Sequence, residues 1–208
     1  MTPHDAYAWL MQTPAPQGCD AFDRHVAGAI LAVALSECGE GVSLAQTCGL
    51  GAVDLRLLAE WGFPRHVEAL VARACDYVFT PDSEEQAVRD ILMMYASGEG
   101  KLERPLAAML ARRCQRPNHL WQDLGLNDRG ELSALMQRHF AGLARRNSGD
   151  MKWKKFLYRM ICGAEGFQLC TTPICTECRD FEACFGDESG ESLLARVRLS
   201  EQISVAAE

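Results

Sequence analysis

The sequence predicts an all-α protein, a single helical domain followed by a C-terminal cysteine-rich loop. Apolar residues recur at spacings of three and four along most of the chain, which is the period of one helix face. The sustained alternation of polar and apolar residues that marks a half-buried strand is not found. Because 208 residues fit one core, we expect a flexible leader at 1–19, a helical domain at 20–162, a cysteine-rich cluster-binding loop at 163–186 and a tail at 187–208.

Start and stop signals divide the helical domain into separate helices. A capping residue and first-turn acids at 80–85 open one helix that ends near 98. Gly125 closes a short helix as a left-handed terminator. The clearest periodicity runs through 128–146, which we expect to be one continuous helix. The other expected helices span 20–37, 53–61, 65–77, 119–124 and 151–162, and one more opens at Pro105.

The charge and hydropathy of the chain argue against several classes of partner. A formal net charge of -7 disfavours broad affinity for nucleic acid or anionic lipid, because phosphate binding depends on a basic surface. The longest apolar run, 27–35, is far shorter than the roughly 20 residues that span a bilayer. The first residues lack the basic region of a secretion signal. We therefore expect a cytoplasmic protein that binds neither nucleic acid nor membrane.

Four of the ten cysteines are clustered near the C-terminus, whereas the other six are scattered. The cluster has the spacing C-x4-C-x2-C-x5-C and consists of Cys170, Cys175, Cys178 and Cys184. Soft thiolates select zinc, copper(I) or iron–sulfur clusters. Structural zinc usually takes two C-x2-C knuckles, whereas C-x4-C-x2-C matches a known iron–sulfur arrangement. The spacing favours an iron–sulfur-type cluster on these four ligands, with a zinc site as the alternative and disulfides as a minor one.

Further candidate residues lie close to the cysteines in the sequence. The helix expected at 151–162 carries four basic residues, Lys152, Lys154, Lys155 and Arg159. They could offset the charge of a cluster, bind an anion or dock an acidic partner, but a solvated helix face is an equally good interpretation. Cys162 and His119 are possible helper ligands, although a buried small thiol and a partly buried histidine are the commoner roles. His139 lies on an apolar stripe and is expected in the core.

Three segments of the chain are distinctive when taken together. They are Arg116-Pro-Asn-His-Leu-Trp-Gln-Asp-Leu-Gly-Leu126, Asp150-Met-Lys-Trp-Lys-Lys-Phe-Leu-Tyr-Arg159 and the cysteine run from Cys170 to Cys184. Together they resemble the NifQ family, a family of nitrogen-fixation proteins. The resemblance is firm over about 116–186, weaker over about 20–114, and absent from the leader and the tail.

The resemblance implies a carrier rather than an enzyme. Such a carrier would hold a molybdenum–iron–sulfur cluster on the four clustered cysteines and donate molybdenum to the assembly of the nitrogenase iron–molybdenum cofactor. The implied partners are the nitrogenase cofactor scaffold complex and the nitrogenase iron protein, in the cytoplasm. In keeping with a non-catalytic role, the sequence has no phosphate loop, nucleotide-binding glycine pattern or nucleophile elbow.

Two other functions are compatible with a cysteine loop on a helical domain. The first is an iron–sulfur DNA-repair glycosylase-like enzyme, against which stand the acidic charge and the lack of a helix-hairpin-helix with its glycine-rich turn. The second is a zinc-stabilised interaction module, which would be a colourless protein that carries zinc and no acid-labile sulfide. Metal analysis of the protein purified without oxygen separates these functions from the cluster carrier.

Overall fold

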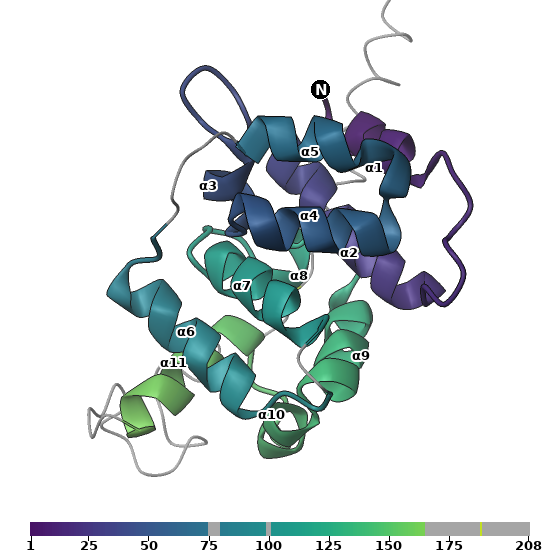
Figure 1. Ribbon diagram of the computed structural model, residues 1–208. Coiled ribbons are helices and arrows are strands. Elements are labelled where there is room, and N and C mark those ends of the chain that lie inside the picture. Colours follow the sequence, from purple (N-terminus) through teal and green to yellow (C-terminus); the bar gives the residue numbers. More distant parts are fainter. Residues whose placement is uncertain (75–79, 99–100, 165–187, 189–208) are drawn as a thin grey trace, which may run out of the picture.

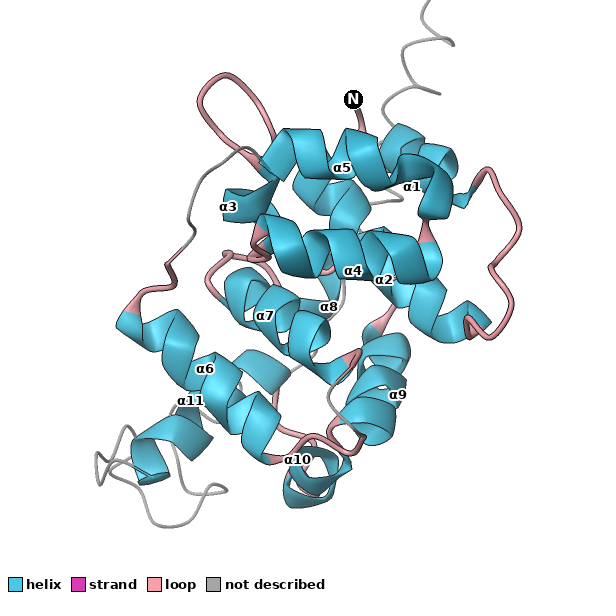
Figure 2. Cartoon of the chain, in the orientation of Figure 1, coloured by secondary structure: helices cyan, strands magenta, loops and turns pink. Residues whose placement is uncertain are grey.

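The computed structural model describes residues 1–74, 80–98, 101–164 and 188 (Figure 1). Helices make up the regular structure of these ranges, and within them there is no strand, only a bridge between Gly39 and Val42 (Figure 2). The all-α prediction is confirmed for these residues. The helices are α1 (Pro3–Met11), α2 (Ala21–Ser36), α3 (Leu44–Cys48), α4 (Ala52–Gly62), α5 (Val67–Ala74), α6 (Ser83–Met94), α7 (Glu103–Cys114), α8 (Leu120–Asp123), α9 (Arg129–His139), α10 (Ala141–Arg146) and α11 (Trp153–Ala164), with a 3-10 turn at Pro64–His66.

Helix α2 forms the centre of the core. Every residue from Val26 to Leu35 is buried, as expected for a helix that is apolar on all sides. The Asp20 carboxylate caps its start by accepting the N–H groups of Phe22 and Asp23 at 2.9 and 3.1 Å. Helices α1 and α3 pack on α2, whereas α4 pairs with α5 and α6 with α7 (Figure 1). None of the described helices combines the length and the apolarity needed to cross a membrane.

The leader expected at 1–19 is not flexible throughout, because it contains helix α1. Thr2 and Asp5 form a reciprocal capping box, and Pro3 occupies the first helical position. The side chains of Ala6 and Leu10 are fully buried against the core. The expectation was wrong for Pro3–Met11, since a helix of this length presents too few apolar residues for periodicity alone to indicate it.

The helix expected at 128–146 is two helices, α9 and α10, which are separated at Phe140. The backbone of Phe140 leaves the helical region, with φ −137° and ψ 47°. Ser97 stabilises the break, because its N–H donates to the carbonyl of His139 at 2.8 Å and its hydroxyl accepts the N–H of Ala141 at 2.9 Å. Ser97 is remote in the sequence, so the apolar period could not reveal the break.

The short helix α3 was also missed, and it places a glycine where no other residue fits. Ser43 and Gln46 form a capping box at its start, and Gly49 ends it with φ 78°. A Cβ atom on Gly49 would lie 2.7 Å from the Cβ of Arg112 on α7. The remaining expected helices are confirmed, with ends shifted by a few residues and with 75–77 outside the described ranges.

Candidate metal-cluster region

The four clustered cysteines, Cys170, Cys175, Cys178 and Cys184, lie outside the described residues. Among the residues that the structure describes, no group of three or more His, Cys, Asp or Glu side chains could hold a metal ion. What the structure gives is the framework on either side of the cysteine segment. Upstream is helix α11, downstream is Glu188, and both contact the stretch from Arg116 to Arg129.

The chain turns into α11 through a tightly hydrogen-bonded corner. The Asn147 side chain bonds the backbone of Met151 in both directions, since its Nδ2 donates to the carbonyl and its Oδ1 accepts the N–H, each at 2.9 Å. Asp150 adopts the left-handed conformation, φ 54°, which aspartate tolerates better than most residues. The Arg129 guanidinium donates to the carbonyl and the carboxylate of Asp150, both at 2.8 Å. This corner fixes where α11 begins.

Lys154 joins α11 to the first of the two family-like helical segments. Its ammonium group donates to the Asp123 carboxylate at 2.5 Å and to the carbonyls of Arg116 and Asn118 at 2.5 and 2.7 Å. The Asp123 side chain is 1% exposed and that of Lys154 is 17% exposed. The second Asp123 oxygen accepts the Asn118 Nδ2 at 2.9 Å. The ion pair is therefore buried, and every proton of the Lys154 ammonium has an acceptor within the chain.

A second buried charge lies directly behind this pair. The Arg113 side chain is fully buried and holds the Glu37 carboxylate with two parallel hydrogen bonds of 2.8 Å. Its Nε donates to the backbone carbonyl of Asp123 at 2.6 Å. Arg116 contacts the same Glu37 carboxylate at 2.8 Å. These bonds connect the end of α2 with α7, α8 and, through Lys154, α11.

Sequence reasoning did not find this network. Glu37 and Arg113 are 76 residues apart, and no local pattern links them. Asp123 and Lys154 both lie in the segments that carry the family resemblance, and their charges were the available signal.

The four basic residues expected on one helix do not all lie on one surface, and Lys152 precedes α11 instead of belonging to it. Lys155 and Arg159 are exposed and four residues apart, so they occupy the same side of the helix. Lys152 is partly buried, and Lys154 points into the protein as described above. Binding of a partner or an anion by these four residues stays a prediction.

His119, one of the two expected helper residues, lies beside Glu188, downstream of the cysteine segment. Its ring is 32% exposed, and its Nδ1 lies 3.5 Å from the carboxylate of Glu188. The other Glu188 oxygen lies 3.2 Å from the Arg129 guanidinium, and the Glu188 side chain is only 6% exposed. Glu188 follows Cys184 by four positions. The structure thus places His119 beside Glu188, which lies four positions after the last cysteine of the quartet.

Two of the other cysteines of the described residues, Cys48 and Cys114, are buried free thiols. Burial raises the pKa of the Cys48 and Cys114 thiols to about 12, so both are protonated at neutral pH. Burial also raises the pKa of Cys19, which is partly exposed. Cys162 falls in the last turns of α11, and its role as a helper ligand stays a prediction.

His139 is buried as predicted, but among charged partners. Its Nε2 lies 3.0 Å from Asp23 and its Nδ1 lies 3.1 Å from Glu103. The ring therefore joins α9 to α2 and α7 by polar contacts.

Comparison with known proteins agrees with the motifs. The NifQ family model matches residues 26–186, a span that includes all four clustered cysteines. The chain is 39% identical over 172 residues to a NifQ homolog of Sinorhizobium fredii, covering 82% of this chain and 75% of that protein. It is 37% identical over 163 residues to the NifQ protein of Rhodobacter capsulatus, with 77% and 88% covered. A third relative, NifQ of Klebsiella pneumoniae, is 45% identical over 82 residues, with 39% and 49% covered. No solved structure matches the chain. The chain therefore belongs to the NifQ family, a family implicated in nitrogen fixation.

Proposed function

We propose that this protein is a non-catalytic carrier that holds a molybdenum–iron–sulfur cluster as its cargo and donates molybdenum to the assembly of the nitrogenase iron–molybdenum cofactor. The observation that carries the proposal is the cysteine quartet Cys170, Cys175, Cys178 and Cys184 in a chain that belongs to the NifQ family. Its four soft thiolates have the ligand chemistry of an iron–sulfur core, and the first three have a matching spacing.

The framework around the quartet supports this function physically. Upstream, Lys154 ties α11 to Arg116, Asn118 and Asp123, and downstream Glu188 contacts His119 and Arg129. The chain between these two flanks starts and returns at one part of the core. Since part of the loop-closure entropy is already lost in the fold, less remains to be lost when four thiolates converge on a cluster.

His119 is the best supported helper ligand. Its Nδ1 lies 3.5 Å from the Glu188 carboxylate, and its ring also accepts the backbone N–H of Gln122. A carboxylate beside one ring nitrogen is a common environment of a metal-binding histidine. We propose that His119, and Cys162 from the end of α11, help to hold the molybdenum corner of the cargo. If the His119→Ala and Cys162→Ala variants keep the molybdenum content and donation of the wild type, this part of the proposal is wrong.

The exposed cations of α11 are proposed to meet the partners. A thiolate-bound cluster is net negative, and the chain as a whole is acidic, so Lys155 and Arg159 offer a local positive surface. Lys152 lies immediately before the first residue of this helix. The proposed partners are the nitrogenase cofactor scaffold complex and the iron protein, and neither nucleic acid nor a membrane is among them. Lys155→Glu with Arg159→Glu should slow transfer to the scaffold complex, whereas Arg65→Glu, an exposed change on the 3-10 turn, should not.

The decisive experiment is purification without oxygen with iron, sulfide and molybdenum quantified. Wild type should contain all three, and Cys175→Ala and Cys178→Ala should lose most of the iron and sulfide. Cys19→Ala removes a thiol outside the quartet, in the loop before α2, and is the matched control that should keep its metal. Zinc without sulfide in the wild type would indicate the interaction module instead. An iron content that is unchanged in both quartet variants would refute the assignment of the ligands.

A further inference from the structure

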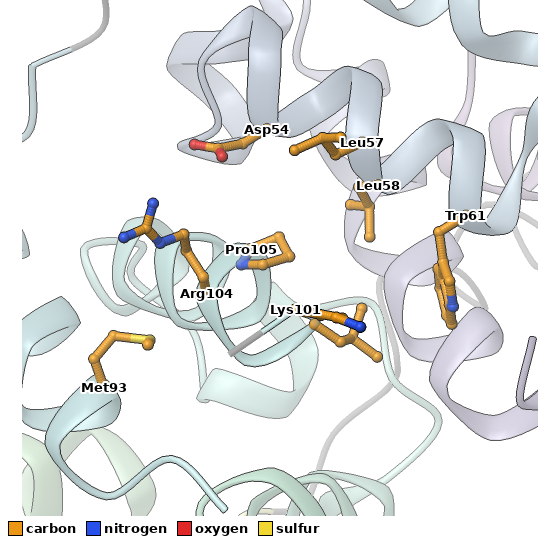
Figure 3. Close-up of a pocket in the computed structure, with 9 residues that line it drawn as sticks. Asp54, Leu57, Leu58, Trp61, Met93, Lys101, Arg104 and Pro105 are labelled. Atoms are coloured by element: carbon orange, nitrogen blue, oxygen red, sulfur yellow. The ribbon is translucent and has the colours of Figure 1, made fainter. Parts of the chain in front are cut away.

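A cleft lies on the side of the molecule formed by α4, α7 and the end of α6. It measures about 730 Å³, and Figure 3 shows α4 contributing Leu57, Leu58 and Trp61 to one wall while Pro105 of α7 faces them. The full lining consists of Asp54, Leu57, Leu58, Trp61, Met93, Lys101, Leu102, Arg104 and Pro105. None of these residues belongs to the framework around the cysteine segment.

Apolar surface continues from the cleft onto its lips. Among the described residues, only five large hydrophobic side chains are exposed, and three of them are Val53, Leu57 and Met94, at 74%, 60% and 71%. Val53, Leu57 and Trp61 follow one another at intervals of four residues, so they form one stripe along α4. Met94 follows Met93, which lines the cleft. Exposed apolar side chains beside an apolar cleft are typical of a binding surface.

The charges at the cleft are distributed unevenly. Asp54 and Arg104 stand on opposite helices towards one end of the cleft, and no ion pair joins them (Figure 3). Arg104 is exposed and makes no hydrogen bond or ion pair with the described residues, while Asp54 is partly buried. Lys101 also lines the cleft. Arg104 is thus an exposed cation at the rim of the cleft, in a chain whose formal net charge is -7.

From these observations we propose that the cleft between α4 and α7 is a docking site for an amphipathic helix of a partner protein, with acidic residues beside its apolar stripe. The apolar residues of the helix would cover Leu57, Trp61 and Met93, and its carboxylates would meet Arg104. A small apolar molecule would fill the cleft but leave Val53 and Met94 in water. A second copy of this acidic chain would repel the first more than a helix whose acidic side meets Arg104. The proposal does not depend on cluster binding by the cysteines.

The test uses fluorescence anisotropy with the full-length protein and a labelled probe helix. The probe is a peptide of about four helical turns with leucine at i, i+3, i+4 and i+7 and glutamate on the flanks. Two further peptides have the same composition in scrambled order, or lysine in place of glutamate. The wild type should bind the glutamate probe with a micromolar dissociation constant and the scrambled peptide at least about tenfold more weakly.

Two variants and a control separate the apolar and the charged contributions. Leu57→Lys should weaken binding of the glutamate probe by about tenfold or more, since it removes an exposed leucine at the centre of the stripe. Arg104→Glu should weaken the glutamate probe and strengthen the lysine probe. Val42→Lys also replaces an exposed hydrophobic residue, but outside the cleft, and should bind like the wild type.

Several results would overturn the proposal. Equal binding of the scrambled and patterned peptides, or equal binding by wild type and Leu57→Lys, would show that the cleft does not recognise a helix. A shift of both charged probes in the same direction on Arg104→Glu would rule out charge complementarity. Self-association of the wild type that Leu57→Lys abolishes, without binding of any probe, would identify the occupant as a second copy of the chain.

Discussion

Replacing Lys154 by methionine tests the buried ion pair that holds α11 in place. The substitution keeps most of the apolar stem of the side chain and removes the ammonium group. It leaves the Asp123 carboxylate, 1% exposed, with Asn118 as its one side-chain partner. It also removes the donor to the carbonyls of Arg116 and Asn118.

The expected loss can be estimated from this geometry. Breaking a buried ion pair by removing one partner costs about 3–5 kcal/mol, because a charge stays buried without compensation. Since the Lys154 side chain is 17% exposed, water can partly reach the site, and we expect the lower end, about 3 kcal/mol. Urea unfolding followed by circular dichroism measures the free energy directly. Asp123→Asn combined with Lys154→Met removes the stranded charge and should recover part of the loss.

Lys155→Met is the matched control, because Lys155 is the neighbouring lysine on the same helix and is exposed. It should change the free energy of unfolding by less than about 0.5 kcal/mol. If Lys154→Met is as stable as Lys155→Met, the buried pair does not hold the helix. If Lys154→Met is destabilised but binds iron as tightly as the wild type, the framework does not assist the cysteine segment.

Three further predictions concern the fold. Leu10→Ala should lower the free energy of unfolding, measured in urea, by about 2–5 kcal/mol, because α1 is part of the core. An unchanged value would show that α1 does not contribute to the stability of the core. Gly49→Ala should cost at least about 1 kcal/mol and lower the melting temperature, since φ is 78° there, whereas Gly51→Ala, with open space around its Cβ position, should change little. Burial raises the pKa of Cys48 and Cys114 to about 12, so the contribution of their neutral thiols to stability is complete below an ordinary thiol pKa of roughly 8.5 and is lost as pH rises towards 12. The free energy of unfolding should therefore fall from about pH 8 to pH 10. The fall should be smaller in the double alanine variant.

Local signals account for the part of the fold that was predicted. The capping residue and first-turn acids at 80–85, which open α6, and the left-handed Gly125, with φ 72°, act within a few residues of the chain, and each was found in its expected place. The mispredicted element depends instead on a contact between residues that are far apart in the sequence. The break at Phe140 depends on Ser97, which lies more than 40 residues earlier, and periodicity carries no information on such a contact.

The same distinction applies to the candidate site. The cysteine quartet could be proposed as a ligand set because its members share one short segment whose spacing has chemical meaning, and that assignment stays a prediction. The pairs Glu37 with Arg113 and Asp123 with Lys154 span 76 and 31 residues. A charged residue in a helical pattern is most often a solvated one, so pairing and burial had to come from the three-dimensional structure.

The inward position of Lys154 also determines which way the rest of α11 faces. Successive residues on a helix are separated by about 100°, so fixing Lys154 against Asp123 fixes the rotation of the whole helix about its axis. Lys155 and Arg159 then point away from the pinned side, with an angle of about 40° between them. The Lys154→Met variant should therefore lose the defined direction of these cations together with stability. Transfer of molybdenum to the scaffold complex can then be compared between two variants. If transfer depends on a fixed positive surface, transfer by Lys154→Met should be slower and less sensitive to salt than transfer by Lys155→Met, which loses only a charge.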